Sequence, residues 1–214
     1  MVPLKRSAAL LLLWLAFASN VHAQAWVNDL LVHRMPSYTE GGEEDCLVCH
    51  SGANMRAMSE NVHGNSEVAG TPASKQGCES CHGPGSIHVS RAHGGKGYPP
   101  LTVFGYGPAS APRDEQVGLC LDCHGVGGEA ASAVEWDGVL HDKWIVNCST
   151  CHQSHAQADP VLNRRQQAEI CFSCHMKQKE GHRKVGKKVP DFSRMGCAGC
   201  HRVHRAPKPE KSGG

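Results

Sequence analysis

Apolar residues are concentrated at the start of the chain. Ala8 to Ala18 is an unbroken apolar run behind two basic residues, and Val21-His22-Ala23 offers small or permissive residues before a cleavage point. The run is too short to cross a bilayer as a stable helix. This arrangement predicts a secretory signal peptide over residues 1–23 and a periplasmic mature protein, with a signal anchor as the alternative.

Beyond residue 23, helical periodicity is confined to short stretches, and we predict helices over Met55–Asn61, Asp114–His124 and Arg164–His175. No stretch alternates convincingly between apolar and polar residues, as a half-buried strand would. The chain holds 24 glycines and 12 prolines, which favour connectors, above all across Gly83–Gly107. The predicted fold is therefore mostly coil with short α-helices and little or no sheet.

The composition argues against an ordinary side-chain core. Only 5% of the 214 residues are aromatic, which is too few for a conventional core. The hydrophobic content of 40% is nevertheless too high for a disordered chain. We therefore expect something other than side chains to fill the interior. The 22 basic and 20 acidic residues nearly balance, which excludes a nucleic-acid binder by composition.

Every cysteine lies in one repeated motif, because all twelve belong to six Cys-x-x-Cys-His units. In a helical turn, two cysteines three residues apart lie on one side, and the histidine that follows turns beneath them. This is the attachment signature of c-type haem, whose vinyl groups take thioether bonds while the imidazole binds iron. In chain order, the motif residues are Cys46, Cys49 and His50; Cys78, Cys81 and His82; Cys120, Cys123 and His124; Cys148, Cys151 and His152; Cys171, Cys174 and His175; and Cys197, Cys200 and His201.

Other uses of paired cysteines fit the pattern less well. Zinc and iron–sulfur sites do not require a histidine after every second cysteine, and a redox dithiol needs only one such unit. Disulfides are usual in exported proteins, but they would not explain the spacing. The prediction is six covalently bound haem c groups, without which we expect no stable core.

The remaining histidines can supply the second axial ligand of each iron. Besides the motif histidines and His22, eight histidines remain for six irons. Bis-histidine iron has no open position for substrate and suits one-electron transfer. His88 is preferred to its neighbour His93 because a Gly-Pro-Gly turn precedes it, and His33 is expected on the surface. The predicted distal ligands are His63, His88, His141, His155, His182 and His204.

Two of these histidines follow a motif histidine by only three residues. Such a residue cannot easily pass around a porphyrin to its opposite face, so each is expected to reach a neighbouring haem. We predict that His155 joins the haem of the third motif and that His204 joins that of the fifth. His141 and His182 would then serve the second haem of their pairs. The methionines are expected to pack rather than to ligate.

Motif spacing divides residues 24–204 into three successive haem pairs, over 46–93, 120–155 and 171–204. These ranges define one predicted hexahaem domain. The ten residues that follow, 205–214, are expected to form a flexible basic tail.

Charge is shared unevenly along the chain. Residues 24–176 hold 9 basic and 17 acidic side chains, a net charge of −8, whereas residues 177–214 hold 11 and 3, a net charge of +8. Two interpretations stay open. In the first, the basic residues near the C-terminus offset the negative charge of haem propionates or stay solvated. In the second, the two ends of the molecule are separate docking surfaces for different redox partners.

The doubled motifs resemble a known family. Cys78–His88, Cys148–His155 and Cys197–His204 are similar to segments of doubled-motif multihaem cytochromes, in particular the periplasmic decahaem DmsE/MtrA-type group of outer-membrane conduits. The resemblance implies bis-histidine haems arranged as a wire, often inside an outer-membrane barrel partner. This chain has six motifs rather than ten, so a barrel-inserted conduit and a periplasmic carrier both remain open.

The sequence therefore predicts a periplasmic electron carrier rather than an enzyme. It would pass electrons from a redox protein donor to an acceptor, toward an outer-membrane barrel protein, an extracellular cytochrome or a terminal reductase. One alternative is a small reductase of nitrogen or sulfur oxyanions, which would need an open haem, and no Cys-x-x-Cys-Lys motif occurs. The other is a filament-forming cytochrome in which a spare histidine such as His33 ligates haem in the next copy.

Overall fold

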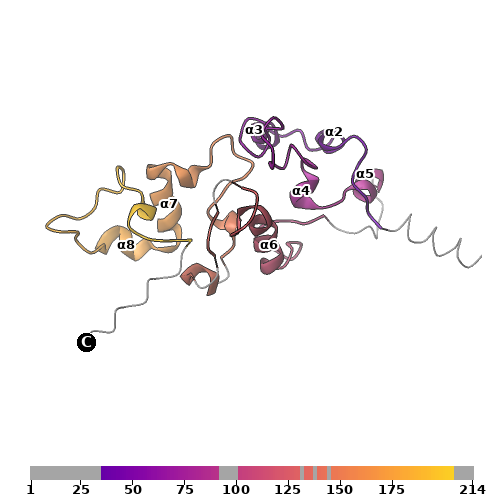
Figure 1. The fold of residues 1–214 in the computed structure, drawn as a ribbon. Coiled ribbons are helices and arrows are strands. Elements are labelled where there is room, and N and C mark those ends of the chain that lie inside the picture. Colours follow the sequence, from indigo (N-terminus) through magenta and orange to yellow (C-terminus); the bar gives the residue numbers. More distant parts are fainter. Residues whose placement is uncertain (1–34, 92–100, 131–132, 137–138, 144–145, 205–214) are drawn as a thin grey trace, which may run out of the picture.

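The computed structural model shows a chain that advances from one end of the molecule to the other in sequence order (Figure 1). The early elements occupy one end, the middle of the chain the centre, and the last elements the opposite end. The predicted signal peptide, the predicted tail, His33 and His93 lie outside the described residues. The described residues are 35–91, 101–130, 133–136, 139–143 and 146–204.

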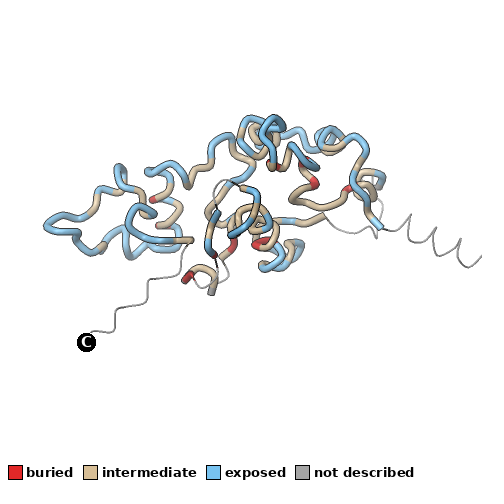
Figure 2. Tube along the Cα trace, viewed as in Figure 1, coloured by how far each residue is buried: buried red, intermediate tan, exposed pale blue. Residues whose placement is uncertain are grey.

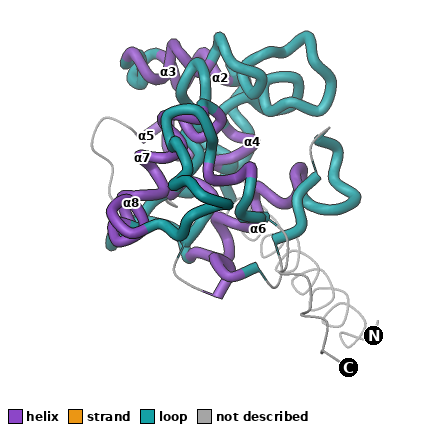
Figure 3. Tube along the Cα trace, turned by 90° about the vertical axis from the view of Figure 1, so that its left-hand side faces the viewer, coloured by secondary structure: helices purple, strands orange, loops and turns teal. Residues whose placement is uncertain are grey.

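Short helices joined by coil make up the described part of the chain, which contains no strand (Figure 3). An isolated antiparallel bridge joins Val185 and Lys188. The prediction of a mostly coil fold with short helices is confirmed. The helices are α2 (Glu43–Leu47), α3 (Ala53–Met58), α4 (Glu79–His82), α5 (Ser86–Arg91), α6 (Arg113–His124), α7 (Arg164–Cys174) and α8 (Met176–Gly181), with 3-10 turns η1 (Leu140–Lys143), η2 (Cys148–Thr150), η3 (Pro160–Leu162) and η4 (Cys197–Gly199).

The two longest helices, α6 and α7, lie where the sequence predicts them. The side chain of Asn163 caps α7 by accepting hydrogen bonds from the backbone amides of Arg165 and Gln166. At α6, Asp114 and Glu115 occupy the first turn, where negative charge favours the helix dipole. None of the helices among the described residues has the length and hydropathy that a membrane crossing requires.

Buried side chains are few and form small, separate groups (Figure 2). One group joins Val117 of α6 to Trp136 and Val139. Another lies on α7, where Phe172 is buried and meets Phe192 edge to face at 5.0 Å between ring centroids. Side chains alone therefore give the fold little apolar burial, as the low aromatic content predicts.

A buried polar network ties α6 to two connectors. Gln116 and Asn147 are each only 2% exposed. The Asn147 amide donates to Gln116 Oε1 at 2.7 Å, and the Gln116 amide donates to the carbonyls of Ala111 at 2.7 Å and Gly105 at 3.1 Å. Because the donors and acceptors are matched, this network fixes the chain on both sides of the third motif.

We expect Asn147→Ala to lower the free energy of unfolding of the haem-loaded protein by about 1–3 kcal/mol, because it removes the buried hydrogen bond that Asn147 donates to Gln116 Oε1. Urea unfolding followed by far-UV circular dichroism measures the change. The matched control is Asn54→Ala on the exposed surface of α3, which should change stability by less than about 0.5 kcal/mol. Equal effects of the two substitutions would contradict the structural role of the network.

Candidate haem-binding sites

Each Cys-x-x-Cys-His motif folds as one helical turn. In five motifs the backbone amide of the histidine donates to the carbonyl of the first cysteine, four residues earlier, at 2.9–3.0 Å. The remaining motif, the third, forms the last turn of α6. This turn places the two thiols and the imidazole of each motif close together, as haem attachment requires.

Each motif histidine lies beside one of the six histidines that the sequence predicts as distal ligands. The separations between ring centroids fall in the narrow range of 5.8–6.4 Å. The rings come from segments that are distant along the chain. The pairs are His50–His88 at 6.4 Å, His82–His155 at 6.1 Å, His63–His124 at 5.9 Å, His152–His204 at 5.8 Å, His141–His175 at 6.2 Å and His182–His201 at 6.1 Å.

These separations fit an iron ion between the two rings. A metal–imidazole bond of about 2.0 Å on each side, with about 1.1 Å from nitrogen to ring centre, gives about 6.2 Å between centroids. Ordinary aromatic contacts span about 4.5–7 Å, so one such pair would carry little weight. Here six pairs, each joining one motif histidine to one other histidine, have this separation.

The partners of three histidines differ from those that the spacing predicts. His155 lies beside the histidine of the second motif rather than the third, and His204 beside that of the fourth rather than the fifth. His141 accordingly lies beside the histidine of the fifth motif rather than the fourth. His182 lies beside that of the sixth motif, as predicted. His155 and His204 therefore each lie beside a motif other than the one that they follow in sequence.

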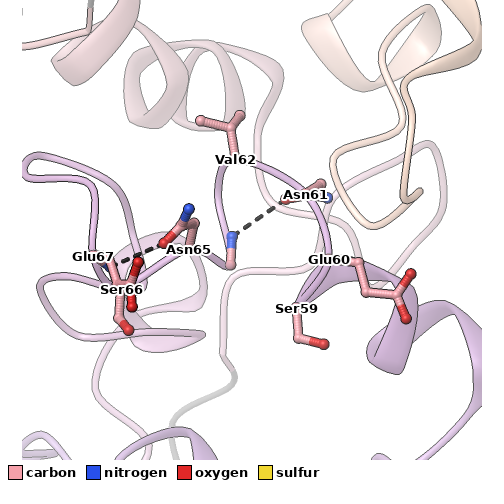
Figure 4. Close-up of a pocket in the computed structure, with 8 residues that line it drawn as sticks. Ser59, Glu60, Asn61, Val62, Asn65, Ser66 and Glu67 are labelled. Atoms are coloured by element: carbon pink, nitrogen blue, oxygen red, sulfur yellow. Dashed lines mark hydrogen bonds between the residues drawn. The ribbon is translucent and has the colours of Figure 1, made fainter.

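Asn61 explains where His155 lies. Its side-chain amide donates to the carbonyls of Ser154 at 2.7 Å and Ala156 at 2.8 Å, which flank His155. Its side-chain oxygen accepts from the amides of His63 at 2.9 Å and Gly64 at 3.2 Å. Figure 4 shows Asn61 in the shallow pocket formed by residues 59–67. One side chain therefore positions two histidines, and nothing in the motif pattern indicates this role.

The six motifs contact one another in chain order. The first cysteines of successive motifs lie close enough to affect each other's pKa in three places: Cys46 with Cys78, Cys120 with Cys148, and Cys171 with Cys197. The second cysteines of the intervening motifs lie close enough to interact electrostatically: Cys81 with Cys123, and Cys151 with Cys174. These thiols occupy the places of the thioether sulfurs of an attached haem. The motifs thus form one row in which two kinds of contact alternate.

Burial affects the titratable groups of these sites. It raises the pKa of the Cys46 thiol to about 12, with the neighbouring Cys78 contributing. The hydrogen bond from Cys120 lowers the pKa of Cys148 to about 7. Burial lowers the pKa of His63, His155 and His204. These imidazoles are therefore neutral at pH 7, the form that can bind a metal.

Hydrogen bonds also orient the imidazole rings through Nδ1. His82 Nδ1 bonds the carbonyl of Thr102 at 2.7 Å, and His152 Nδ1 bonds Asp159 Oδ2 at 2.5 Å. An occupied Nδ1 leaves Nε2 as the nitrogen that faces a metal. Sequence reasoning missed both partners; the Asp-Pro step that begins η3 is the only local signal for Asp159.

Two comparisons with known proteins bear on these sites. A model of the doubled CXXCH motif family matches residues 141–180. Multiheme cytochrome MtrA from Shewanella baltica (strain OS185) is 29% identical over 201 residues, which cover 89% of this chain and 57% of that protein. The chain thus spans a little over half the length of this relative.

The motifs, the paired imidazoles and both comparisons make this chain similar to multihaem c-type cytochromes.

We expect Asn61→Ala to speed hydrogen exchange at the amides of His63 and Gly64, because both lose their acceptor. Exchange at residues 154–156 should also rise, because the tie between the two segments is lost. Mass-spectrometric hydrogen exchange with fragment-level resolution measures both effects.

Asn65→Ala is the matched control in the same pocket. The side chain of Asn65 accepts a local hydrogen bond, from the Glu67 amide at 3.0 Å. Exchange at residues 154–156 should stay unchanged in this variant. If both variants loosened residues 154–156 equally, Asn61 would not be the tie.

Proposed function

We propose that this cytochrome binds six haems and carries single electrons along them between protein partners in the periplasm. The six imidazole pairs carry the proposal, because each has the separation that an axially ligated iron needs. Bound haem supplies one-electron chemistry through the ferric and ferrous states of its iron.

The side chains have three roles in this proposal. The twelve motif cysteines fix the porphyrins by thioether bonds, and the six motif histidines are the proximal ligands. The distal ligands close the opposite face. From the first motif to the sixth, they are His88, His155, His63, His204, His141 and His182.

Saturated ligation favours a carrier over a reductase. When imidazoles of the chain occupy both axial positions, no position remains for a nitrogen or sulfur oxyanion. The rings belong to segments held by backbone and side-chain hydrogen bonds, so they stay in place in both oxidation states. The alternating cysteine contacts keep neighbouring motifs in a fixed order, which supports electron transfer from the first site to the sixth or the reverse.

The resemblance to outer-membrane conduits supports a place on a route toward the outer membrane. The relative MtrA is also named a multiheme cytochrome, and this chain covers 57% of its length. A row of six sites is shorter than a row of ten. We therefore propose a carrier that exchanges electrons with separate donor and acceptor proteins, with a barrel protein or an extracellular cytochrome among the possible acceptors.

Electron paramagnetic resonance of the oxidised, exported protein tests the ligation. We expect six haem masses on the polypeptide and only low-spin ferric signals. His155→Ala should convert one haem in six to a high-spin form, because it removes an axial ligand. His93→Ala, at a histidine predicted not to ligate, should leave the spectrum unchanged. A fully low-spin spectrum of His155→Ala would contradict the assignment.

Asp159 should make the haem of the fourth motif differ from the others. Its Oδ1 accepts from the amides of Gln153 and Val161, which holds the carboxylate against His152. A carboxylate that accepts from Nδ1–H makes the imidazole a stronger donor to ferric iron. The ferric state is then favoured, so this haem should have a lowered reduction potential.

We expect Asp159→Asn to raise the reduction potential of one haem by roughly 60 mV, equivalent to a tenfold change in the equilibrium constant for one electron. A spectroelectrochemical titration measures it, and Asp159→Glu should restore part of the shift. Asp191→Asn removes the same charge from an exposed residue bonded to Ser193 and should leave this haem unchanged. Equal shifts in the two asparagine variants would indicate a general charge effect instead.

A further inference from the structure

The end of the molecule that carries the sixth motif is mostly exposed (Figure 2), and its sequence is strongly basic. We call it the basic end. Six basic residues make up the basic end, and none of them has a carboxylate within salt-bridge distance in the part of the chain that the structure describes. Lys179 differs, because it pairs with Glu169 at 3.2 Å. The basic end consists of Lys177, Arg183, Lys184, Lys187, Lys188 and Arg202, all exposed.

Two residues of the basic end are sequence neighbours of the last pair of imidazoles. Arg183 follows His182, whose Nδ1 bonds the Arg183 carbonyl at 2.7 Å, and Arg202 follows His201. Lys177 lies on α8, whereas Lys187 and Lys188 lie on a tight loop closed by the bridge from the Val185 amide to the Lys188 carbonyl at 2.9 Å, and Lys184 comes just before that loop. The charges are therefore held near a proposed redox site, not spread along a featureless tail.

Apolar side chains are interspersed with these charges. Val185 is 62% exposed and Val189 52% exposed, on the same loop as the lysines. A purely solvating charged surface has no need of exposed valines, whereas a protein contact surface combines apolar patches with a polar rim. This mixture of charge and exposed apolar side chains is compatible with a protein contact surface.

The opposite end of the molecule has the opposite charge. Glu43 and Glu44 of α2 are exposed there, as is Glu40 just before the helix. Other carboxylates at this end are already engaged: Glu79 is buried and bonds Thr39, and Asp45 accepts from the Gly41 amide. The exposed acidic residues around α2 thus number three, fewer than the six charges of the basic end, so we favour a separate acidic protein over a second copy that docks through this end.

We propose that the basic end is the docking surface for an acidic redox protein that exchanges electrons with the sixth haem. This inference rests on the proposed function and names the partner of its last site. Opposite charges would raise the association rate, and the few exposed apolar residues would keep the complex short-lived. Salt screens such attraction, so the rate should depend on ionic strength.

The test is stopped-flow oxidation of the dithionite-reduced, haem-loaded cytochrome by an acidic plastocyanin, used as the probe. The variant Lys184→Glu/Lys187→Glu/Lys188→Glu reverses three charges of the basic end. We expect its second-order rate at low ionic strength to fall by about tenfold or more, and the difference from the unmodified protein to vanish at high salt.

A matched control reverses three exposed charges elsewhere. Arg56→Glu/Arg164→Glu/Arg165→Glu changes the net charge equally, and its rate should fall less than twofold. Haem content and the low-spin spectrum of each variant are checked first, so that a folding defect is recognised. Equal loss in both variants, or a rate that salt does not change, would overturn the proposal.

Two further measurements separate the other outcomes. p-Benzoquinone, a neutral oxidant, should react equally with all three proteins. If it failed to oxidise even the unmodified protein, the proposed function would fail rather than the docking surface. Sedimentation velocity should show a monomer. A concentration-dependent oligomer that only the basic-end variant abolishes, with plastocyanin rates unchanged, would assign the surface to a second copy and overturn the acidic partner.

Discussion

Two imidazoles about 6 Å apart, on opposite faces of one iron, form the constraint on which the proposed architecture depends. A short motif can fix one imidazole relative to its two cysteines, and here a single helical turn does so. The second imidazole must come from elsewhere in the chain. The coil segments of this chain bring six more histidines to positions beside the six motif histidines.

This constraint takes over part of the role of an apolar core. Buried side chains such as Val117 and Phe172 form only small groups in the described residues. The pairs His63–His124 and His82–His155 instead join segments 61 and 73 residues apart. Each pair closes a long loop, and closing a loop lowers the conformational entropy of the unfolded chain much as a disulfide does. The Asn61 side chain strengthens the same connection through four hydrogen bonds.

The sequence predicts the local parts of this arrangement better than the distant ones. Spacing alone locates the motifs, and counting histidines leaves eight candidates, of which six lie beside motif histidines in the described residues. Helices α6 and α7 follow from periodicity, whereas α5 lies unforeseen within the predicted connector, just after the Gly-Pro-Gly turn. The partners of His155 and His204 could not be predicted, because a histidine carries no local signal of which motif it will meet. Long-range hydrogen bonds, such as those of Asn61, decide that.

Six sites with the same pair of ligands would have similar potentials unless their surroundings differ. The hydrogen-bond partners of Nδ1 supply such a difference: a neutral carbonyl at His82, a carboxylate at His152 and another carbonyl at His182. The carboxylate lies in the middle of the row, at the fourth motif, whereas the basic residues lie around the sixth. Positive charge near an iron favours its ferrous form, so the basic end should raise the potential of the last haem. The two effects together would give an energetic slope from the fourth site toward the sixth, which makes the basic end the natural exit for electrons.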